Sequence, residues 1–158
     1  MELEAAVQRD PKDASAWYEL GVKQQENERE QKAIQALRRA VDLDPTHLPT
    51  WIALAVSYTN DSNRTGTFSA INEWVERNNK YAETVRGYRA EFPDNQVASP
   101  TERFGYLIQC LITMARSDVS GEIDADIQIA LAVLLNTNEV CFEVVGFQFF
   151  STDPFLGL

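Results

Sequence analysis

The chain has 158 residues, of which 44% are hydrophobic and 24% charged, a balance that suits one globular domain with a sizeable buried core. Its net charge of −10 argues against nucleic acid or anionic lipid as a partner and favours a basic peptide, although acidity of this size also serves solubility. The longest apolar stretch, residues 127–135, is too short to cross a bilayer, so we expect no transmembrane segment.

The first half of the chain repeats itself with a period of 34 residues. Trp17, Leu20, Gly21, Ala33, Leu37, Ala40 and Pro45 correspond in this way to Trp51, Leu54, Ala55, Thr67, Ile71, Trp74 and Asn79. This period and pattern are typical of the tetratricopeptide repeat (TPR), a helix–turn–helix unit that buries its apolar face against copies of itself. The sequence therefore predicts an all-α TPR solenoid with regular repeats over residues 1–79, in which the given sequence begins inside the second helix of an earlier repeat.

The pattern weakens over residues 80–121, which we interpret as a degenerate repeat or hinge region. Gly87, Pro93 and Pro100 are separated there by polar residues, as in a loop. Apolar residues at helical spacing then predict a helix over about 101–116, with Pro100 and Thr101 at its start. A turn-rich connector over residues 118–126 should follow it.

A further first helix is predicted over residues 122–139, beginning near Asp124. Its partner helix should follow, but residues 140–158 form a divergent apolar tail with clustered aromatics and no helical stripe. One hypothesis is that this tail is a translated intron, because Val140 and Cys141 can be encoded by GTATGT, which has the form of a 5′ splice site. The alternative is a genuine tail that folds back on the last helix.

A second stripe on each first helix is expected to face the concave groove of the solenoid. Its members are Tyr18, Val22, Gln25 and Glu26 in one repeat, and Ile52, Val56, Thr59 and Asn60 in the next. An asparagine such as Asn60 can both donate to and accept from a peptide backbone, Thr59 adds a hydroxyl, and Asp61 adds a charge for a basic side chain. Alternatively, Asn60 and Asp61 only cap the helix and shape the turn.

Several runs of the chain resemble one family. LEAAVQRDPKDASAWYELGVKQQENEREQKAIQALRRAVDLDP, then LAVSYTND and IDADIQIALAVLLNTNE, are similar to the cargo-binding half of the peroxisomal targeting signal type 1 receptor. The resemblance covers residues 2–81 well and 122–139 moderately. It implies a divergent hinge repeat between two lobes and a groove that binds C-terminal Ser-Lys-Leu (SKL) type signals.

By the same resemblance, the peptide-binding residues are Val56, Thr59, Asn60 and Asp61, and Asn136 is a weaker candidate because it matches Thr59 in the last pattern. The family captures the terminal carboxylate mostly with asparagines of later repeats and docks at the membrane through a long N-terminal region, and this sequence includes neither. The resemblance thus implies a cytoplasmic receptor that cycles to the peroxisomal membrane, with peroxisomal docking proteins bound through other regions. An incomplete fragment is expected to bind cargo weakly.

No enzyme, cofactor or metal signature is present in the sequence. It has no phosphate loop and no Gly-x-Ser-x-Gly, and its cysteines, Cys110 and Cys141, are too few for a disulfide framework or a metal motif. Two binding classes remain beside the receptor. A clamp for acidic C-terminal peptides would need Lys or Arg on the groove stripe, which supplies none. A generic TPR scaffold or adaptor for protein–protein interaction remains the alternative.

Overall fold

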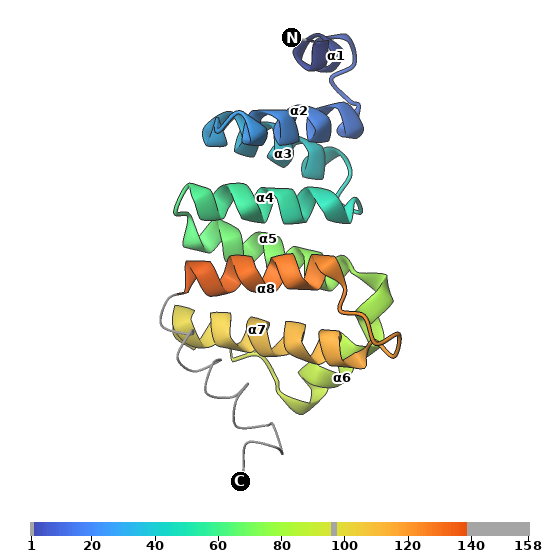
Figure 1. Ribbon diagram of the computed structural model, residues 1–158, viewed down its shortest axis with the longest axis vertical. Helices are drawn as coiled ribbons and strands as arrows, with labels where there is room; N and C mark the ends of the chain where they lie inside the picture. Colours follow the sequence, from blue (N-terminus) through green and yellow to red (C-terminus); the bar gives the residue numbers. More distant parts are fainter. Residues whose placement is uncertain (1, 96–97, 139–158) are drawn as a thin grey trace.

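The computed structural model describes residues 2–95 and 98–138, and within these ranges every regular element is helical. In chain order the helices are α1 (Glu2–Arg9), α2 (Ala14–Glu26), α3 (Glu30–Leu43), α4 (Leu48–Asn60), α5 (Arg64–Arg77), the 3-10 turn η1 (Asn79–Tyr81), α6 (Ala82–Glu91), α7 (Pro100–Ser117) and α8 (Ala125–Thr137). They stack one above another along the long axis (Figure 1). The predicted all-α TPR solenoid is confirmed.

The 34-residue period is visible in the backbone of the two turns that join α2 to α3 and α4 to α5. Glu28 and Ser62 hold the same place in the two repeats and have positive φ angles of 56° and 58°. In both turns the residue that follows donates its N–H back into the preceding helix, from Arg29 to Gln24 O at 2.9 Å and from Asn63 to Tyr58 O at 2.8 Å. The left-handed residue thus reverses the chain and satisfies carbonyls at the helix end.

Small residues bring the two helices of each hairpin into close contact. A Cβ atom on Gly21 would lie 2.5 Å from Leu37 Cγ, so α3 approaches α2 closely because Gly21 has no side chain. The matching pair in the next hairpin is Ala55 and Ile71, both 0% exposed. Residues of α3, α4 and α5 continue into one core with α7 and α8.

The tryptophans do not share one environment, although all three lie at positions of the repeat pattern. Trp74 is 1% exposed, whereas Trp17 and Trp51 are half-buried. The indole N–H of Trp51 donates to Pro45 O at 2.9 Å, and that of Trp17 donates to Pro11 O at 3.0 Å. The repeat tryptophan therefore lies at the entrance of its hairpin, where it holds the preceding turn.

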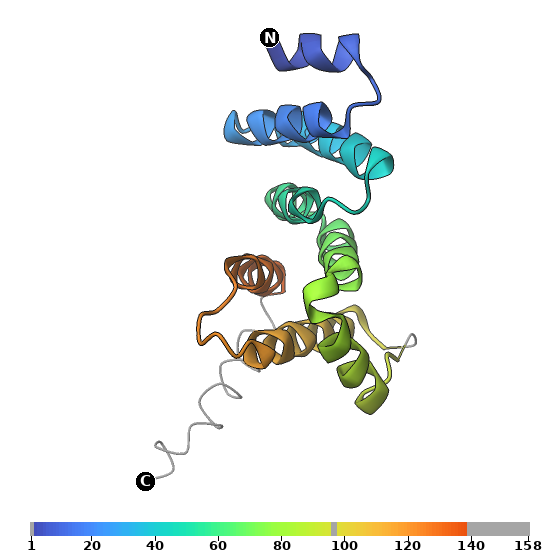
Figure 2. The same ribbon diagram turned by 90° about the vertical axis from the view of Figure 1, so that its right-hand side faces the viewer.

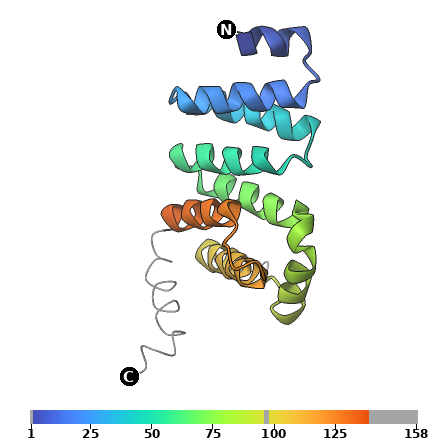
Figure 3. The same cartoon turned by 45° about the vertical axis from the view of Figure 1, so that its right-hand side comes forward.

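Beyond α5 the chain leaves the repeat and then returns to it. Helices α6 and α7 occupy most of the region predicted to be a degenerate repeat or hinge, and α7 begins with a capping box in which Ser99 and Glu102 bond reciprocally. α8 then comes back to contact α4 and α5, far earlier in the sequence. In Figures 1 and 3, α2, α4 and α8 run in the same direction, so α8 occupies the place of the next repeat's first helix.

Within the described residues α8 packs against α7, the helix before it in the chain, whereas the partner helix predicted to follow α8 would lie outside the described residues. α7 packs against α8, and the two contribute Leu107, Ile108, Leu111, Ile127 and Leu134 to the core, each at most 1% exposed. The predicted tail, residues 140–158, lies outside the described residues. None of the described helices is both long and apolar enough to span a membrane.

Candidate functional site

The residues predicted to bind a peptide lie at the C-terminal end of α4. Pro49 in the first turn helps to start this helix, where its missing N–H costs nothing. The helix ends at Asn60, and Asp61 follows as the C-cap residue. Val56 and Thr59 are half-buried, while Asn60 and Asp61 are exposed. Solvent exposure of the four side chains therefore increases along the chain from Val56 to Asp61.

Thr59 lies where α4, α5 and α8 meet. Its hydroxyl donates to Ala55 O at 2.9 Å, within its own helix. The same oxygen is 3.1 Å from Thr67 Oγ1 on α5 and 3.3 Å from Thr137 Oγ1 on α8. Three threonines from three helices thus form one hydroxyl cluster, and Thr59 Oγ1 has local partners on every side.

Asn60 and Asp61 link α4 to the hairpin before it. Asn60 Nδ2 donates to Glu30 Oε1 at 2.9 Å, and Asp61 Oδ1 accepts from Gln31 Nε2 at 2.7 Å. Capping of the next helix falls to Asn63 instead, whose side chain accepts from the Gly66 N–H at 2.8 Å. The side chains of Asn60 and Asp61 therefore make contacts between repeats, and Asp61 is also the C-cap residue of α4.

An acceptor remains open beside this contact. The second carboxylate oxygen of Glu30, Oε2, is buried and has no hydrogen-bond partner. A buried acceptor of this kind carries a desolvation cost until a donor reaches it. The beginning of α3 and the end of α4 are thus joined by two hydrogen bonds and together form a small acidic site.

Part of the predicted groove stripe is wrong. Ile52 is only 8% exposed and belongs to the core. Gln25 Nε2 donates to Ala53 O at 3.0 Å and to Ser57 Oγ at 2.8 Å, so it bridges α2 and α4. The physical reason is that the first helices of successive repeats contact one another. Some side chains of the stripe are covered by this contact, and the others stay at the surface.

Asn136 joins the site through the return of α8. It is exposed, and its neighbour Thr137 contacts Thr59. Asn136 and Asn60 thus lie at the C-terminal ends of two helices that contact each other, α8 and α4, although 76 positions separate them in the sequence. Figure 2 shows α2, α4 and α8 on one side of the array, with α3 and α5 on the other.

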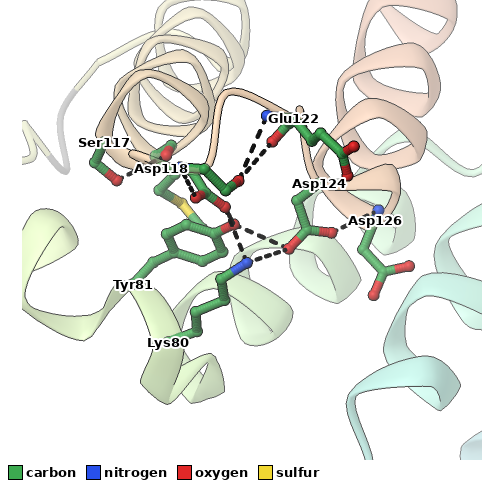
Figure 4. A network of polar contacts seen from close by, with 9 residues as sticks. Lys80, Tyr81, Ser117, Asp118, Glu122, Asp124 and Asp126 are labelled. Atoms are coloured by element: carbon green, nitrogen blue, oxygen red, sulfur yellow. Dashed lines mark hydrogen bonds and ion pairs between the residues drawn. The ribbon is translucent and has the colours of Figure 1, made fainter.

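A polar clasp, formed by Lys80, Tyr81, Asp118 and Asp124, holds α8 in this position (Figure 4). Lys80 Nζ lies 3.0 Å from Asp118 Oδ2 and 3.3 Å from Asp124 Oδ2, and the Tyr81 hydroxyl donates to Asp124 Oδ2 at 2.9 Å. The two aspartates flank the connector between α7 and α8. The clasp thus ties both ends of this connector to the turn after α5.

The clasp favours the ionised form of its carboxylates. Hydrogen bonds from Ser120 and from Lys80 lower the pKa of Asp118 to about 2. For Asp124, burial opposes ionisation, but hydrogen bonds from Tyr81, the Asp126 N–H and Lys80 lower the pKa overall. Sequence reasoning missed the clasp because its members follow no repeat period. Among the described residues no group of three or more His, Cys, Asp or Glu side chains could hold a metal ion.

Comparison with known proteins identifies relatives of this chain. No protein-family model matches the chain. A peroxisomal targeting signal receptor of Komagataella phaffii is 35% identical over 138 residues, which are 87% of this chain and 24% of the relative. The receptor of the same name in Yarrowia lipolytica is 35% identical over 138 residues, 87% of this chain and 23% of the relative.

A PEX5-related protein of Mus musculus is 48% identical over 84 residues, 53% of this chain and 15% of the relative. The chain thus spans about a quarter or less of the length of these curated relatives. Over most of its own length, this all-α TPR chain is a homologue of the peroxisomal targeting signal receptors and PEX5-related proteins.

Proposed function

We propose that this chain is part of a peroxisomal matrix protein import receptor that binds C-terminal SKL-type targeting signals on the face formed by α2, α4 and α8. The single observation that carries the proposal is the homology to proteins named peroxisomal targeting signal receptors over 87% of the chain. A receptor of this kind works by recognising a peptide, so we infer a binding role and not an enzymatic one. It would act in the cytoplasm and cycle to the peroxisomal membrane, where docking proteins receive it.

The chemistry at the end of α4 suits a basic peptide with an extended backbone. Among the described residues no donor bonds to the carbonyl oxygen of Asn60, and its amide is shared with Glu30, so both groups can exchange partners with a peptide backbone. Glu30 and Asp61 supply negative charge, and Glu30 Oε2 lacks a donor. The lysine of an SKL signal would supply one. Val56 offers an apolar surface beside them.

The remaining candidate residues have different parts in this proposal. Thr59 is saturated by Ala55, Thr67 and Thr137, so we assign it the role of setting the distance between α4 and α8. Asn136 is exposed one residue from that contact and is free to approach a peptide from the α8 side. A targeting-signal receptor requires a free C-terminal carboxylate on its ligand, whereas a generic scaffold does not. An experiment that varies this carboxylate therefore distinguishes the receptor from the scaffold.

The proposal is tested in a chimera, because the chain matches only a quarter of the relative. Residues 2–138 replace the matching segment of the Komagataella phaffii receptor, and fluorescence anisotropy measures binding of a labelled peptide ending in Ser-Lys-Leu. We expect the chimera to bind the free-carboxylate peptide and to bind its amidated form far more weakly. Equal binding of the two peptides would support the scaffold instead.

Asn60→Ala in the chimera tests the groove assignment. Loss of one or two hydrogen bonds to the peptide, each worth about 0.5–1.5 kcal/mol, predicts binding about tenfold weaker. Asn72→Ala is the matched control, because Asn72 lies on α5, on the opposite side of the array, and only accepts a 3.5 Å bond from Arg89. Unchanged affinity in Asn60→Ala, with helix content preserved, would reassign Asn60 to the inter-repeat contact alone.

A further inference from the structure

A cavity lies between the beginnings of α5 and α7. The cavity there has a volume of about 380 Å³, within the range of specific ligand pockets. Apolar surface comes from Phe68, Pro100 and Phe104, and two arginines, Arg64 and Arg103, complete the wall. None of the residues proposed to bind the targeting signal takes part in it.

Each arginine is stacked on an aromatic ring of the other helix. Arg64 Cζ, on α5, lies 5.3 Å from the centre of the Phe104 ring on α7, and Arg103 Cζ, on α7, lies 4.8 Å from that of Phe68 on α5. The two rings are themselves 5.3 Å apart. A guanidinium over an aromatic ring is held there by the attraction of its charge to the ring face, and the ring takes none of its N–H groups as a conventional hydrogen-bond acceptor would. The cavity wall thus carries two guanidinium groups with several donors each.

One of these donors is buried and unsatisfied, and neither arginine is paired with a carboxylate of the described residues. No ion pair joins Arg64 or Arg103 to a carboxylate in the described part of the chain, although other arginines there, such as Arg77 and Arg89, are paired. Arg103 Nε is buried and has no hydrogen-bond partner. Arg64 donates to Asn138 Oδ1 at 3.1 Å, a neutral acceptor.

The acidic residue next to Arg103 in sequence is already engaged. Glu102 accepts from the Ser99 N–H at 2.7 Å as part of the capping box of α7, and this bond lowers the pKa of its carboxyl group. If the arginines had only a structural role, their contacts with the two aromatic rings would be sufficient. Such a role would leave the buried Arg103 Nε without an acceptor beside an open cavity. Buried N–H groups normally find an acceptor, so the missing acceptor indicates an external ligand.

We propose that this cavity binds an acidic segment of a partner protein, with a carboxylate on the edges of Arg64 and Arg103 and a neighbouring aromatic side chain against Phe68 and Phe104. The chemistry follows from the walls: paired guanidinium edges match a carboxylate, and the rings match an apolar group beside it. The site shares no residue with those proposed to bind the targeting signal, and it differs from them in charge, because a basic SKL signal would be repelled here.

The probe is a capped tetrapeptide, acetyl-Ala-Glu-Phe-Ala-amide, whose only carboxylate is the glutamate side chain. Its matched control replaces Glu with Gln, and 3-phenylpropionate tests a small-molecule source of the same groups. Binding to the 158-residue chain is measured by titration at low salt, and we expect the Glu peptide to bind at least about tenfold more tightly than the Gln peptide. Added salt should weaken the binding of the Glu peptide.

Variants locate the binding. Arg103→Gln should weaken binding of the Glu peptide at least about tenfold. Arg103→Lys, which keeps the charge but loses the planar fork, should weaken it by a smaller factor, and this separates binding from any loss of fold in the first variant. Arg39→Gln removes the same charge from an exposed position on α3 and should leave binding unchanged.

Three outcomes would overturn the proposal. Equal affinity for the Glu and Gln peptides, or no binding of either, would show that the arginines do not read a carboxylate. Equal affinity of Arg103→Gln and the unaltered chain would place the binding elsewhere. Binding of 3-phenylpropionate without binding of the Glu peptide would make the cavity a small-molecule site. None of these results depends on whether the chain binds SKL signals.

Discussion

Replacing Gly21 by alanine is expected to destabilise the protein, although alanine is the better helix former. Inside a helix the exchange of Gly for Ala is worth about 1 kcal/mol in favour of folding. At Gly21, however, the added Cβ would lie 2.5 Å from Leu37 Cγ, 2.7 Å from Leu37 Cδ2 and 3.3 Å from the Leu37 backbone nitrogen. Cγ is a branch point, so rotation of a terminal methyl group cannot relieve the contact.

The magnitude follows from the surroundings of Leu37. This side chain is 0% exposed, so it can give way only by displacing other core residues. Overpacking of this kind costs about 1–3 kcal/mol, and the short contact places Gly21 in the upper part of that range. After subtraction of the helix-propensity gain of about 1 kcal/mol, Gly21→Ala should lower the free energy of unfolding by about 1–2 kcal/mol.

The matched control is Gly87→Ala in α6, where no atom lies within 4 Å of the added Cβ. It should raise the free energy of unfolding by about 0.5–1 kcal/mol, because only the propensity term remains. Urea denaturation followed by far-UV circular dichroism gives both values. In the background of Leu37→Ala, the exchange at Gly21 should lose its cost. Equal, stabilising effects at Gly21 and Gly87 would refute the close approach of α2 and α3.

Two further predictions concern the core and the clasp. Trp74→Ala should lower the free energy of unfolding by about 3–5 kcal/mol and Trp51→Ala by only about 1–3 kcal/mol, because Trp51 is half-buried; equal losses in urea denaturation would contradict the two environments. For the clasp, the pKa of Asp118 is lowered from 3.8 to about 2, so its ionised form stabilises the fold above about pH 4, and this contribution is lost as the pH falls to about 2. The stability difference between the unaltered chain and Asp118→Asn, measured by urea denaturation at a series of pH values, should therefore shrink over that range. A difference that stays constant down to pH 2 would show that the ionised carboxylate of Asp118 contributes nothing.

The repeated half of the fold could be predicted from sequence because its information is local and periodic. Gly21 and Leu37 recur as Ala55 and Ile71, and this spacing alone fixes two hairpins and their contacting faces. The start of α8 was also predicted, since Asp124 is its N-cap and accepts from the Asp126 N–H. α6 gave a weaker signal because only Val85 on it is buried, so it has no apolar stripe to detect.

The candidate site was predictable in position and less so in contacts. The sequence placed Asn60 and Asp61 at a helix end, but their partners, Glu30 and Gln31, lie 30 positions earlier and become neighbours only when hairpins stack. Ile52 was misassigned because the twist between successive first helices decides which stripe is covered, and no residue type records that twist. The arginine cavity likewise depends on α5 and α7 meeting at their beginnings.

Because α8 contacts helices far earlier in the chain, we expect it to dock more slowly than α2, α3, α4 and α5 assemble. Contacts among α2, α3, α4 and α5 join neighbours in the chain, so these helices can assemble quickly and in order during synthesis. Docking of α8 on the hairpin of α4 and α5 must instead close a loop that contains η1, α6 and α7, at a cost in chain entropy. Hydrogen exchange should accordingly find the amides of α8 opening separately from those of α4 and α5. The hydroxyl cluster around Thr59 is then a late structure, completed only when the last described helix arrives.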